Sequence, residues 1–148
     1  MMKLNYKGFT LVELLAVIAI MGMLAVIMVP TISGVIEENK TNSLSNLKNS
    51  IKSSARAYIS DNRYEIRLDG SCTNSTTRNI TSIDAESITE SKITVELLIK
   101  KGYLKSNSDD IINPKTNKQI YKSNSYIVVK YNCSSKDYDY DNIVINDK

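Results

Sequence analysis

Glu13 is the residue whose surroundings most restrict the chemistry of this chain. It stands at the start of an apolar segment, and no charged residue occurs between Leu14 and Ile36. A carboxylate one turn into a membrane helix costs about 2.5–3.5 kcal/mol on insertion scales, so we expect Glu13 to have a partner. The alternative is that Glu13 lies at the level of the lipid headgroups, near the end of the helix.

The chain has no histidine among its 148 residues. This absence excludes His-dependent triads, imidazole metal sites and histidine general bases. No nucleophile–base pair can be identified either, so we expect neither enzymatic activity nor a cofactor. The formal net charge is +3, but without Lys3 and Lys7 there are 17 basic residues against 16 acidic ones, so no nucleic-acid partner is indicated.

Three aspartates, Asp137, Asp139 and Asp141, alternate with tyrosines near the end of the chain. On a strand they would share a face and repel one another. The pattern is not an EF-hand, because Asn142 occupies the glycine position and Lys148 stands where the last glutamate is required. We therefore predict a solvated acidic loop, with calcium binding as the alternative.

The apolar segment is long enough to cross a membrane as a helix. At 1.5 Å per residue it spans about 35 Å, compared with a hydrocarbon core of about 30 Å. Lys3 and Lys7 precede it, and Glu37 and Glu38 follow it. The positive-inside rule predicts a single-pass plasma membrane protein with a cytoplasmic N-terminus and the remaining chain outside.

Cys72 and Cys133 are the only cysteines, and both lie on the predicted outer side. Two thiols outside the cytosol more often pair than stay free. A bridge between them would stabilise the fold by about 4 kcal/mol in the chain-entropy model. Two cysteines without histidine do not complete a four-ligand zinc site, so we predict a disulfide and no metal site.

A short motif combines the residues before and within the apolar segment: Lys7, Gly8–Leu15 (GFTLVELL), Gly22 and Pro30. In these residues the chain resembles the type IV pilin family, including its pseudopilin branch, and the resemblance covers residues 1–36. It implies that a membrane aspartyl peptidase cuts a basic leader between Gly8 and Phe9. The same enzyme then N-methylates Phe9, and Glu13 becomes the fifth residue of the mature chain.

The chemistry of Glu13 agrees with this resemblance. Cleavage would create an α-amino group at Phe9, which a neighbouring subunit can bring to the Glu13 carboxylate. Each charge costs several kcal/mol to remove from water alone, so pairing them inside lipid or protein favours docking. The resemblance implies as partners copies of the chain and other pilins, the peptidase and methylase, an inner-membrane assembly platform, and membrane lipid before assembly.

Gly22 and Pro30 interrupt the apolar segment. Pro30 has no N–H to donate, and glycine weakens a helix by about 0.8–1 kcal/mol relative to alanine. In the pilin family these two positions bracket a segment that can lose helicity within the filament. The alternative is a kink that lipid tolerates.

Helical periodicity continues beyond the apolar segment, although the composition becomes polar. Apolar residues recur at spacings of three and four: Leu44, Leu47, Ile51, Ala55, Tyr58 and Ile59. Such a stripe packs on a globular part. We therefore predict one long helix from about Phe9 to Asp61.

The remaining chain predicts a connection, a short helix and a few strands. Residues 67–91 are rich in Ser, Thr and Asn, and we expect a long surface connection there. Thr94–Gly102 predicts a short helix with Thr94 as its N-cap and Gly102 just past its end. After a turn at Asn113–Asn117, strands are predicted at Lys118–Lys122, Tyr126–Tyr131 and Asn142–Asn146.

These elements predict an α+β fold, in which a long N-terminal spine helix packs against a small C-terminal antiparallel β-sheet head. The predicted divisions are a cleaved leader (1–8), a transmembrane and assembly half of the helix (9–36), an amphipathic half (37–62) and a globular head (63–148).

The function that these features favour is a structural subunit of a type IV pilus-like filament. One alternative is a pseudopilin of a type II secretion or DNA-uptake apparatus, which the resemblance implies equally. Another is a single-span membrane-anchored binding domain that never polymerises. That alternative predicts an uncut N-terminus and no role for Glu13.

Overall fold

The computed structural model describes residues 8–72, 76–82, 88, 90–105 and 110–148, so Lys3 and Lys7 lie outside the described residues. The chain divides into an N-terminal unit ending at Asn39 and a C-terminal unit, Lys40–Lys148. Its elements, in chain order, are α1 (Leu11–Asp61), β1 (Ile66–Asp69), β2 (Thr77–Ser82), β3 (Lys92–Thr94), α2 (Val95–Lys100), β4 (Tyr126–Asn132) and β5 (Asp137–Val144).

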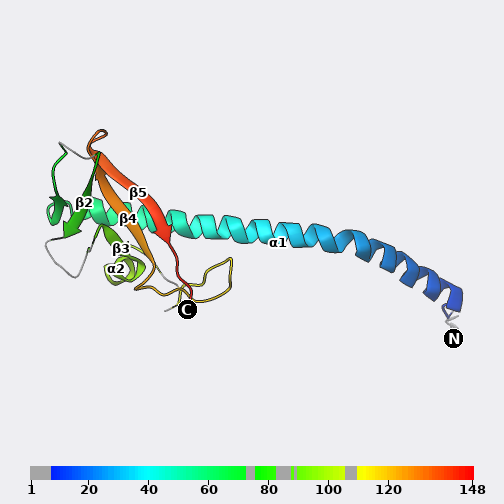
Figure 1. Cartoon of the computed structure of the whole chain (residues 1–148). Coiled ribbons are helices and arrows are strands. Elements are labelled where there is room, and N and C mark those ends of the chain that lie inside the picture. Colours follow the sequence, from blue (N-terminus) through cyan, green and yellow to red (C-terminus); the bar gives the residue numbers. More distant parts are fainter. Residues whose placement is uncertain (1–7, 73–75, 83–87, 89, 106–109) are drawn as a thin grey trace, which may run out of the picture. The chain divides into compact units, whose positions relative to one another are not determined.

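The five strands form one antiparallel sheet organised around β4 (Figure 1). β5 pairs with β4 along its whole length. The other edge of β4 is shared, because β2 pairs with its last residues and β3 with its first. β1 extends the sheet beyond β2. The predicted α+β class and the predicted strand at Tyr126–Tyr131 are therefore confirmed.

The C-terminal part of α1 packs against this sheet through the stripe that the sequence predicts. Ile51, Ala55, Tyr58 and Ile59 are buried. They share one apolar core with sheet and α2 residues: Ile80, Ile93, Val95, Leu98, Ile127 and Val129. Each such side chain, fully buried, contributes about 1.5–3 kcal/mol, so this core holds the C-terminal unit together.

The short helix α2 begins and ends as its sequence predicts. The Thr94 hydroxyl accepts the N–H of Leu97 at 3.2 Å, which is the bond of an N-cap. Gly102 has a φ of +79°, the left-handed conformation that glycine adopts without a Cβ penalty just past a helix. Leu98 of α2 is fully buried, so the helix closes one side of the core.

The prediction of a long surface connection over residues 67–91 is wrong. β1 and β2 lie within or beside it, and β3 follows directly, although residues 73–75, 83–87 and 89 lie outside the described residues. Only every second residue of β1 turns toward the core, and Ile80 is the one fully buried residue of β2. Polar residues occupy the other positions, so the two-residue alternation of a strand is not evident in the sequence.

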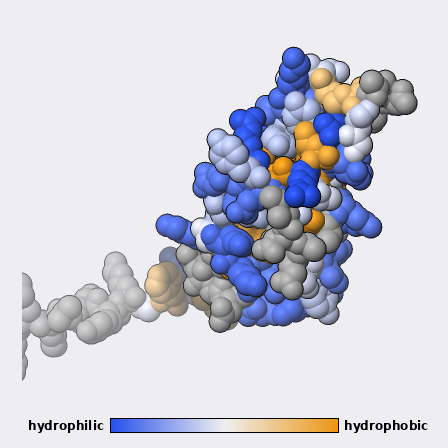
Figure 2. Space-filling model, turned by 90° about the vertical axis from the view of Figure 1, so that its left-hand side faces the viewer, coloured by the Kyte–Doolittle hydropathy of each residue, from blue (hydrophilic) through white to orange (hydrophobic). Residues whose placement is uncertain are grey.

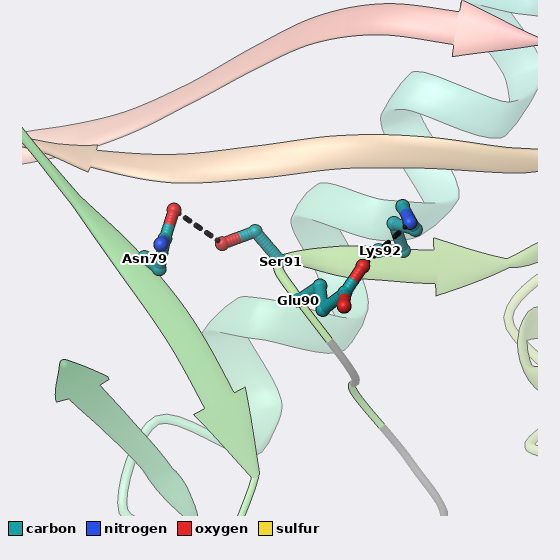
Figure 3. Close-up of polar contacts among 4 residues, drawn as sticks. All are labelled: Asn79, Glu90, Ser91 and Lys92. Carbon is teal, nitrogen blue, oxygen red and sulfur yellow. Dashed lines mark hydrogen bonds and ion pairs between the residues drawn. The ribbon is translucent and has the colours of Figure 1, made fainter.

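Ser91 connects the two strands that share one edge of β4. Its side chain is fully buried, and its hydroxyl accepts the N–H of Ile80 at 2.9 Å. The same hydroxyl donates to Asn79 Oδ1 at 3.3 Å (Figure 3). The Ser91 carbonyl accepts the N–H of Val129 at 2.8 Å. Ser91 thus supplies hydrogen-bond partners for backbone N–H groups at the point where the pairing of β4 changes from β2 to β3. Without them these groups would be buried and unpaired.

The predicted acidic loop is part of a strand, so that prediction is also wrong. β5 begins at Asp137 and includes Asp139 and Asp141. Tyr138 and Tyr140 alternate with these aspartates and pack against the core. The predicted strand at Asn142–Asn146 is therefore the second half of a longer strand.

A bulge at Asn142 explains why β5 looks like two segments in the sequence. Ile127 pairs with Ile143, but Val128 pairs with Asp141, so Asn142 is the extra residue. Its φ of +53° is one that asparagine tolerates better than most residues. The bulge shifts the alternation, and Ile143 therefore faces the core like Tyr140.

Lys118–Lys122 forms isolated bridges rather than the predicted strand. Ile120 is buried as expected, but Gln119 bridges to Ile112 while Ile120 bridges to Asp147. The segment lies between two different partners, and neither pairing is long enough to make a ladder. The turn that precedes it, at Asn113–Asn117, is present as predicted, with Asn117 at a φ of +58°.

A disulfide joins Cys72 to Cys133, with 5.7 Å between their Cα atoms and a separation of 61 residues in sequence. Cys72 follows β1, and Cys133 follows β4 directly. The N–H of Cys133 donates to the carbonyl of Thr76 at 3.0 Å. The bridge therefore ties the connection between β1 and β2 to the end of the central strand.

We expect the double substitution Cys72→Ser and Cys133→Ser to lower the free energy of unfolding of the C-terminal unit by about 2–4 kcal/mol, because the unfolded chain regains the entropy of a long open loop. Urea unfolding of the full chain in neutral detergent, followed by circular dichroism, measures this. Reductant should destabilise the original protein and leave the double variant unchanged. Equal stability of the two proteins would contradict the prediction.

Candidate functional site

The N-terminal unit exposes apolar side chains on every side of its helix. Every described side chain from Phe9 to Ile27 is exposed, and Val26, for example, is 76% exposed. A helix that is hydrophobic all round requires a membrane or a large protein core. Among the described residues, α1 alone is long and apolar enough to cross a membrane, and none of its apolar window is buried.

The C-terminal unit has the opposite surface. In the view of Figure 2, hydrophilic side chains cover most of it. Its apolar side chains are gathered in the core shared by α1, α2 and the sheet. The C-terminal unit thus buries most of its apolar residues, although Tyr64, Ile112 and Tyr121 are exposed and Figure 2 shows an apolar patch among the hydrophilic side chains. The N-terminal unit requires surroundings that supply apolar contact.

Glu13 has a partner within its own chain, and that partner is Thr10. The N–H of Thr10 donates to Glu13 Oε2 at 2.9 Å, and the Thr10 hydroxyl donates to the same oxygen at 3.0 Å. The Glu13 N–H lies 3.3 Å from the Thr10 hydroxyl oxygen. These reciprocal bonds are a capping box, which pairs backbone N–H groups that the first turn leaves without acceptors.

The sequence also contains a signal for this capping box, although the predictions from the sequence did not include it. Thr10 and Glu13 have the Thr-x-x-Glu spacing of a capping box and stand directly before an apolar run. The motif places the start of α1 at Leu11, one residue after Thr10. Phe9 therefore lies just outside the helix.

The capping box leaves part of the Glu13 carboxylate available. Both bonds from Thr10 end on Oε2, and Oε1 accepts no hydrogen bond from the described residues. These bonds are also made by neutral donors, so the negative charge is not neutralised. A cationic donor can still approach Oε1 without displacing Thr10.

The two residues of the predicted cleavage site are both accessible. Gly8 and Phe9 lie outside α1 and are exposed, and Phe9 is 87% exposed. A Cβ added to Gly8 would meet no heavy atom within 4 Å. The fold therefore does not require glycine at this position, and any requirement must come from a partner.

Gly22 and Pro30 lie within α1, whose helical hydrogen bonding extends from Leu11 to Asp61 in the isolated chain. A Cβ added to Gly22 also meets no heavy atom within 4 Å. Neither residue ends the helix here. Their predicted role therefore concerns the assembled filament and stays a prediction.

The three aspartates of β5 do not form a separate acidic site. Asp139 accepts a hydrogen bond from the Asn132 amide at 2.8 Å and stands opposite Lys130 in the register of the sheet. Lys130, Asp139 and Asp141 also line one cavity of about 230 Å³. No group of three or more metal-ligating side chains is arranged to hold an ion among the residues that the structure describes.

We expect Thr10→Val to weaken the first turn of α1 by about 0.5–2 kcal/mol, because it keeps the β-branched shape and removes the capping hydroxyl. Amide hydrogen exchange of the full chain in micelles should then be faster at Glu13. Thr10→Ser is the matched control, since it retains the hydroxyl and should keep the original rate. Equal rates in the two variants would show that the capping box does not hold this turn.

Comparison with known proteins adds one finding to this geometry. The prokaryotic N-terminal methylation motif matches residues 3–29, a range that includes Gly8, Phe9, Thr10, Glu13 and Gly22. The comparisons with curated proteins and with solved structures found no match. The matched motif indicates a structural, non-enzymatic class of protein. The chain thus carries the prepilin-type signature of type IV pilins and pseudopilins.

Proposed function

We propose that the chain is a structural subunit of a type IV pilus-like filament. In this proposal it is held in the membrane by α1, with its N-terminus in the cytoplasm and its C-terminal unit outside. The prepilin peptidase cuts between Gly8 and Phe9 and methylates the new amine. An inner-membrane assembly platform then moves the subunit from lipid into a helical array with its copies and other pilins.

The observation that carries this proposal is the methylation motif on a helix whose apolar side chains are exposed. Each of these side chains gains about 1.5–3 kcal/mol when it is fully buried, and lipid or neighbouring helices can supply that burial. A filament built through α1 satisfies them after the subunit leaves the membrane. The same helix thus serves as membrane anchor and as assembly surface.

We propose that Glu13 directs this assembly by pairing with the Phe9 amine of a neighbouring subunit. The support is the free Oε1 atom and the unneutralised charge at the start of α1. An ammonium and a carboxylate buried separately each carry a penalty of several kcal/mol, which the pair reduces. In the family that the chain resembles, the minor subunits that cap filament tips often lack a glutamate at the fifth mature position, so Glu13 favours a subunit of the shaft.

Pseudopilins share the motif and the machinery, and filament length on cells separates the two possibilities. A non-polymerising single-span binding domain differs more sharply, because it requires neither cleavage nor Glu13. Two experiments test the proposal against that alternative.

The first experiment concerns processing at Gly8. We expect Gly8→Val to insert into the membrane and fold normally, because nothing within 4 Å obstructs a side chain there. It should remain uncut, since a bulky residue does not fit a peptidase site that accepts glycine. Gly34→Val adds the same volume to another unobstructed glycine and should be cut normally. N-terminal sequencing distinguishes these outcomes, and assembled fibres whose subunits still begin at Met1 would refute the proposed processing.

The second experiment separates the charge of Glu13 from its capping role. Glutamine at the third helical position also completes a capping box, so Glu13→Gln should keep the start of α1 and lose only the charge. Insertion should persist, because a neutral side chain is easier to bury. Cleavage should persist as well, because the cut lies five residues before this position. Assembly should fall by about 10-fold or more, since several kcal/mol per subunit are lost when the Phe9 amine has no partner.

The measurement compares surface fibres with mature membrane-bound subunit in cells that have this subunit alone. Glu38→Gln is the matched control, because it removes an exposed carboxylate from the same helix and should assemble normally. Normal fibre formation by Glu13→Gln at the original rate would show that the charge pair does not drive docking.

A further inference from the structure

A cavity of about 170 Å³ lies in the C-terminal unit, between the last turns of α1 and the start of β5. Its lining includes two guanidinium groups, Arg56 and Arg63, and the Ser60 hydroxyl. Tyr138 and Tyr140 line it from the strand. The two sides of the cavity are far apart in the sequence, so it exists only when β5 is folded against α1.

The two guanidinium groups in this cavity are not neutralised by ion pairs. Within the described ranges of the chain, neither Arg56 nor Arg63 has a carboxylate oxygen within 4.0 Å. Asp137 also lines the cavity, but one of its oxygens accepts the N–H of Tyr138 at 2.8 Å. Two cations and one carboxylate leave the cavity with one net positive charge.

Arg56 and Arg63 are both exposed, so the cavity is open to solvent, and Arg56 lies against an aromatic ring. Its guanidinium carbon lies 5.2 Å from the centre of the Tyr140 ring. A guanidinium over an aromatic face is oriented by cation–π attraction, and its N–H groups remain free at its edge. This arrangement reduces the entropy that a ligand would otherwise have to remove on binding.

Tyr140 adds no negative charge to the cavity at physiological pH. Burial, with a further contribution from Asp137, raises the pKa of the Tyr140 phenol to about 12. The phenol therefore stays neutral at physiological pH. An anion entering the cavity meets the Asp137 carboxylate as its one anionic neighbour in the lining.

We propose that this cavity binds a phosphate ester through Arg56 and Arg63. A tetrahedral phosphate presents oxygens in several directions, which suits donors that come from more than one direction around the cavity. A carboxylate presents its two oxygens in one plane, so a phosphate ester fits two guanidinium groups that approach from different sides better than a carboxylate does. A singly charged phosphodiester also balances the single net positive charge. The ester can be a soluble molecule or a lipid headgroup, because both present the same group.

The test is a nuclear magnetic resonance titration of the full chain in neutral micelles with glycerophosphoglycerol, a soluble and singly charged phosphodiester. Saturable shifts are expected at the amides of residues 56–63 and 137–140. Arg63→Gln should weaken binding about 10-fold or more, because it removes a charge-assisted hydrogen bond. Arg67→Gln is the matched control, since Arg67 is exposed on β1, does not line the cavity, and should bind as the original chain does.

The remaining arms identify the source of the phosphate and the outcomes that overturn the proposal. The same shifts in phosphatidylglycerol nanodiscs, without added ester, identify a lipid headgroup, and their absence there identifies a soluble ester. Equal shifts with sodium acetate would overturn the proposal in favour of a carboxylate, such as an acidic protein segment. Shifts that do not saturate, or an equal loss of binding in Arg67→Gln, would also overturn the proposal. If Arg63→Gln misfolds, Ser60→Asp places a carboxylate in the cavity and should weaken binding instead.

Discussion

A carboxylate in an apolar environment must be satisfied, and the N-terminal unit is arranged around that requirement. Thr10 supplies hydrogen bonds to Glu13 from within the chain, and it does so at one oxygen alone. Hydrogen bonds from neutral groups do not neutralise the Glu13 carboxylate. In an apolar environment this carboxylate therefore still requires a cation beside it. In the function proposed here, cleavage before Phe9 creates that cation one residue before Thr10. In that proposed function the amine pairs with Oε1 while the cap uses Oε2, so the two can operate together.

The two units of the chain satisfy their apolar residues in different ways. The C-terminal unit buries its own core beneath a hydrophilic surface, and the Cys72–Cys133 bridge ties two ends of its sheet. Ser91 pairs the backbone groups at the point where β2 and β3 exchange places along β4. The N-terminal unit has no comparable core among its described residues and exposes its apolar side chains. The C-terminal unit thus buries apolar residues within the chain, whereas the N-terminal helix depends on apolar surroundings.

The sequence predicted the features that rest on strong periodicity or on local punctuation. The stripe from Ile51 to Ile59, the capped helix α2 and the central strand β4 follow from apolar spacing and from Thr94 and Gly102. β1 and β2 were missed because few of their residues are buried, so the alternation is weak. In β5 the aspartates have low strand propensity, and the bulge at Asn142 breaks the two-residue period. β2 and β5 are stabilised by pairing with β4, and β1 by pairing with β2. The pairing with β4 is a long-range interaction that local sequence does not encode.

The functional residues, too, could be predicted from the sequence only in part. Glu13 and the residues around Gly8 stand out in the sequence, whereas the contribution of Thr10 depends on seeing both members of the capping box together. The cavity beside Arg56 and Arg63 could not be predicted, because it forms only where β5 meets α1. Spatial clusters of this kind require the topology of the sheet to be known first.

In the proposed filament, the Glu13 carboxylate of one subunit contacts the Phe9 amine of another. Solid-state nuclear magnetic resonance measures this directly in fibres assembled from two populations of subunits. One population carries ¹⁵N at the Phe9 amine, and the other carries ¹³C at the Glu13 carboxyl carbon. The account predicts a dipolar coupling that corresponds to ion-pair contact, with nitrogen and oxygen within about 4 Å, and predicts it in mixed fibres and not in micelles of the same mixture. Mixed fibres that assemble fully and show no such coupling would contradict it.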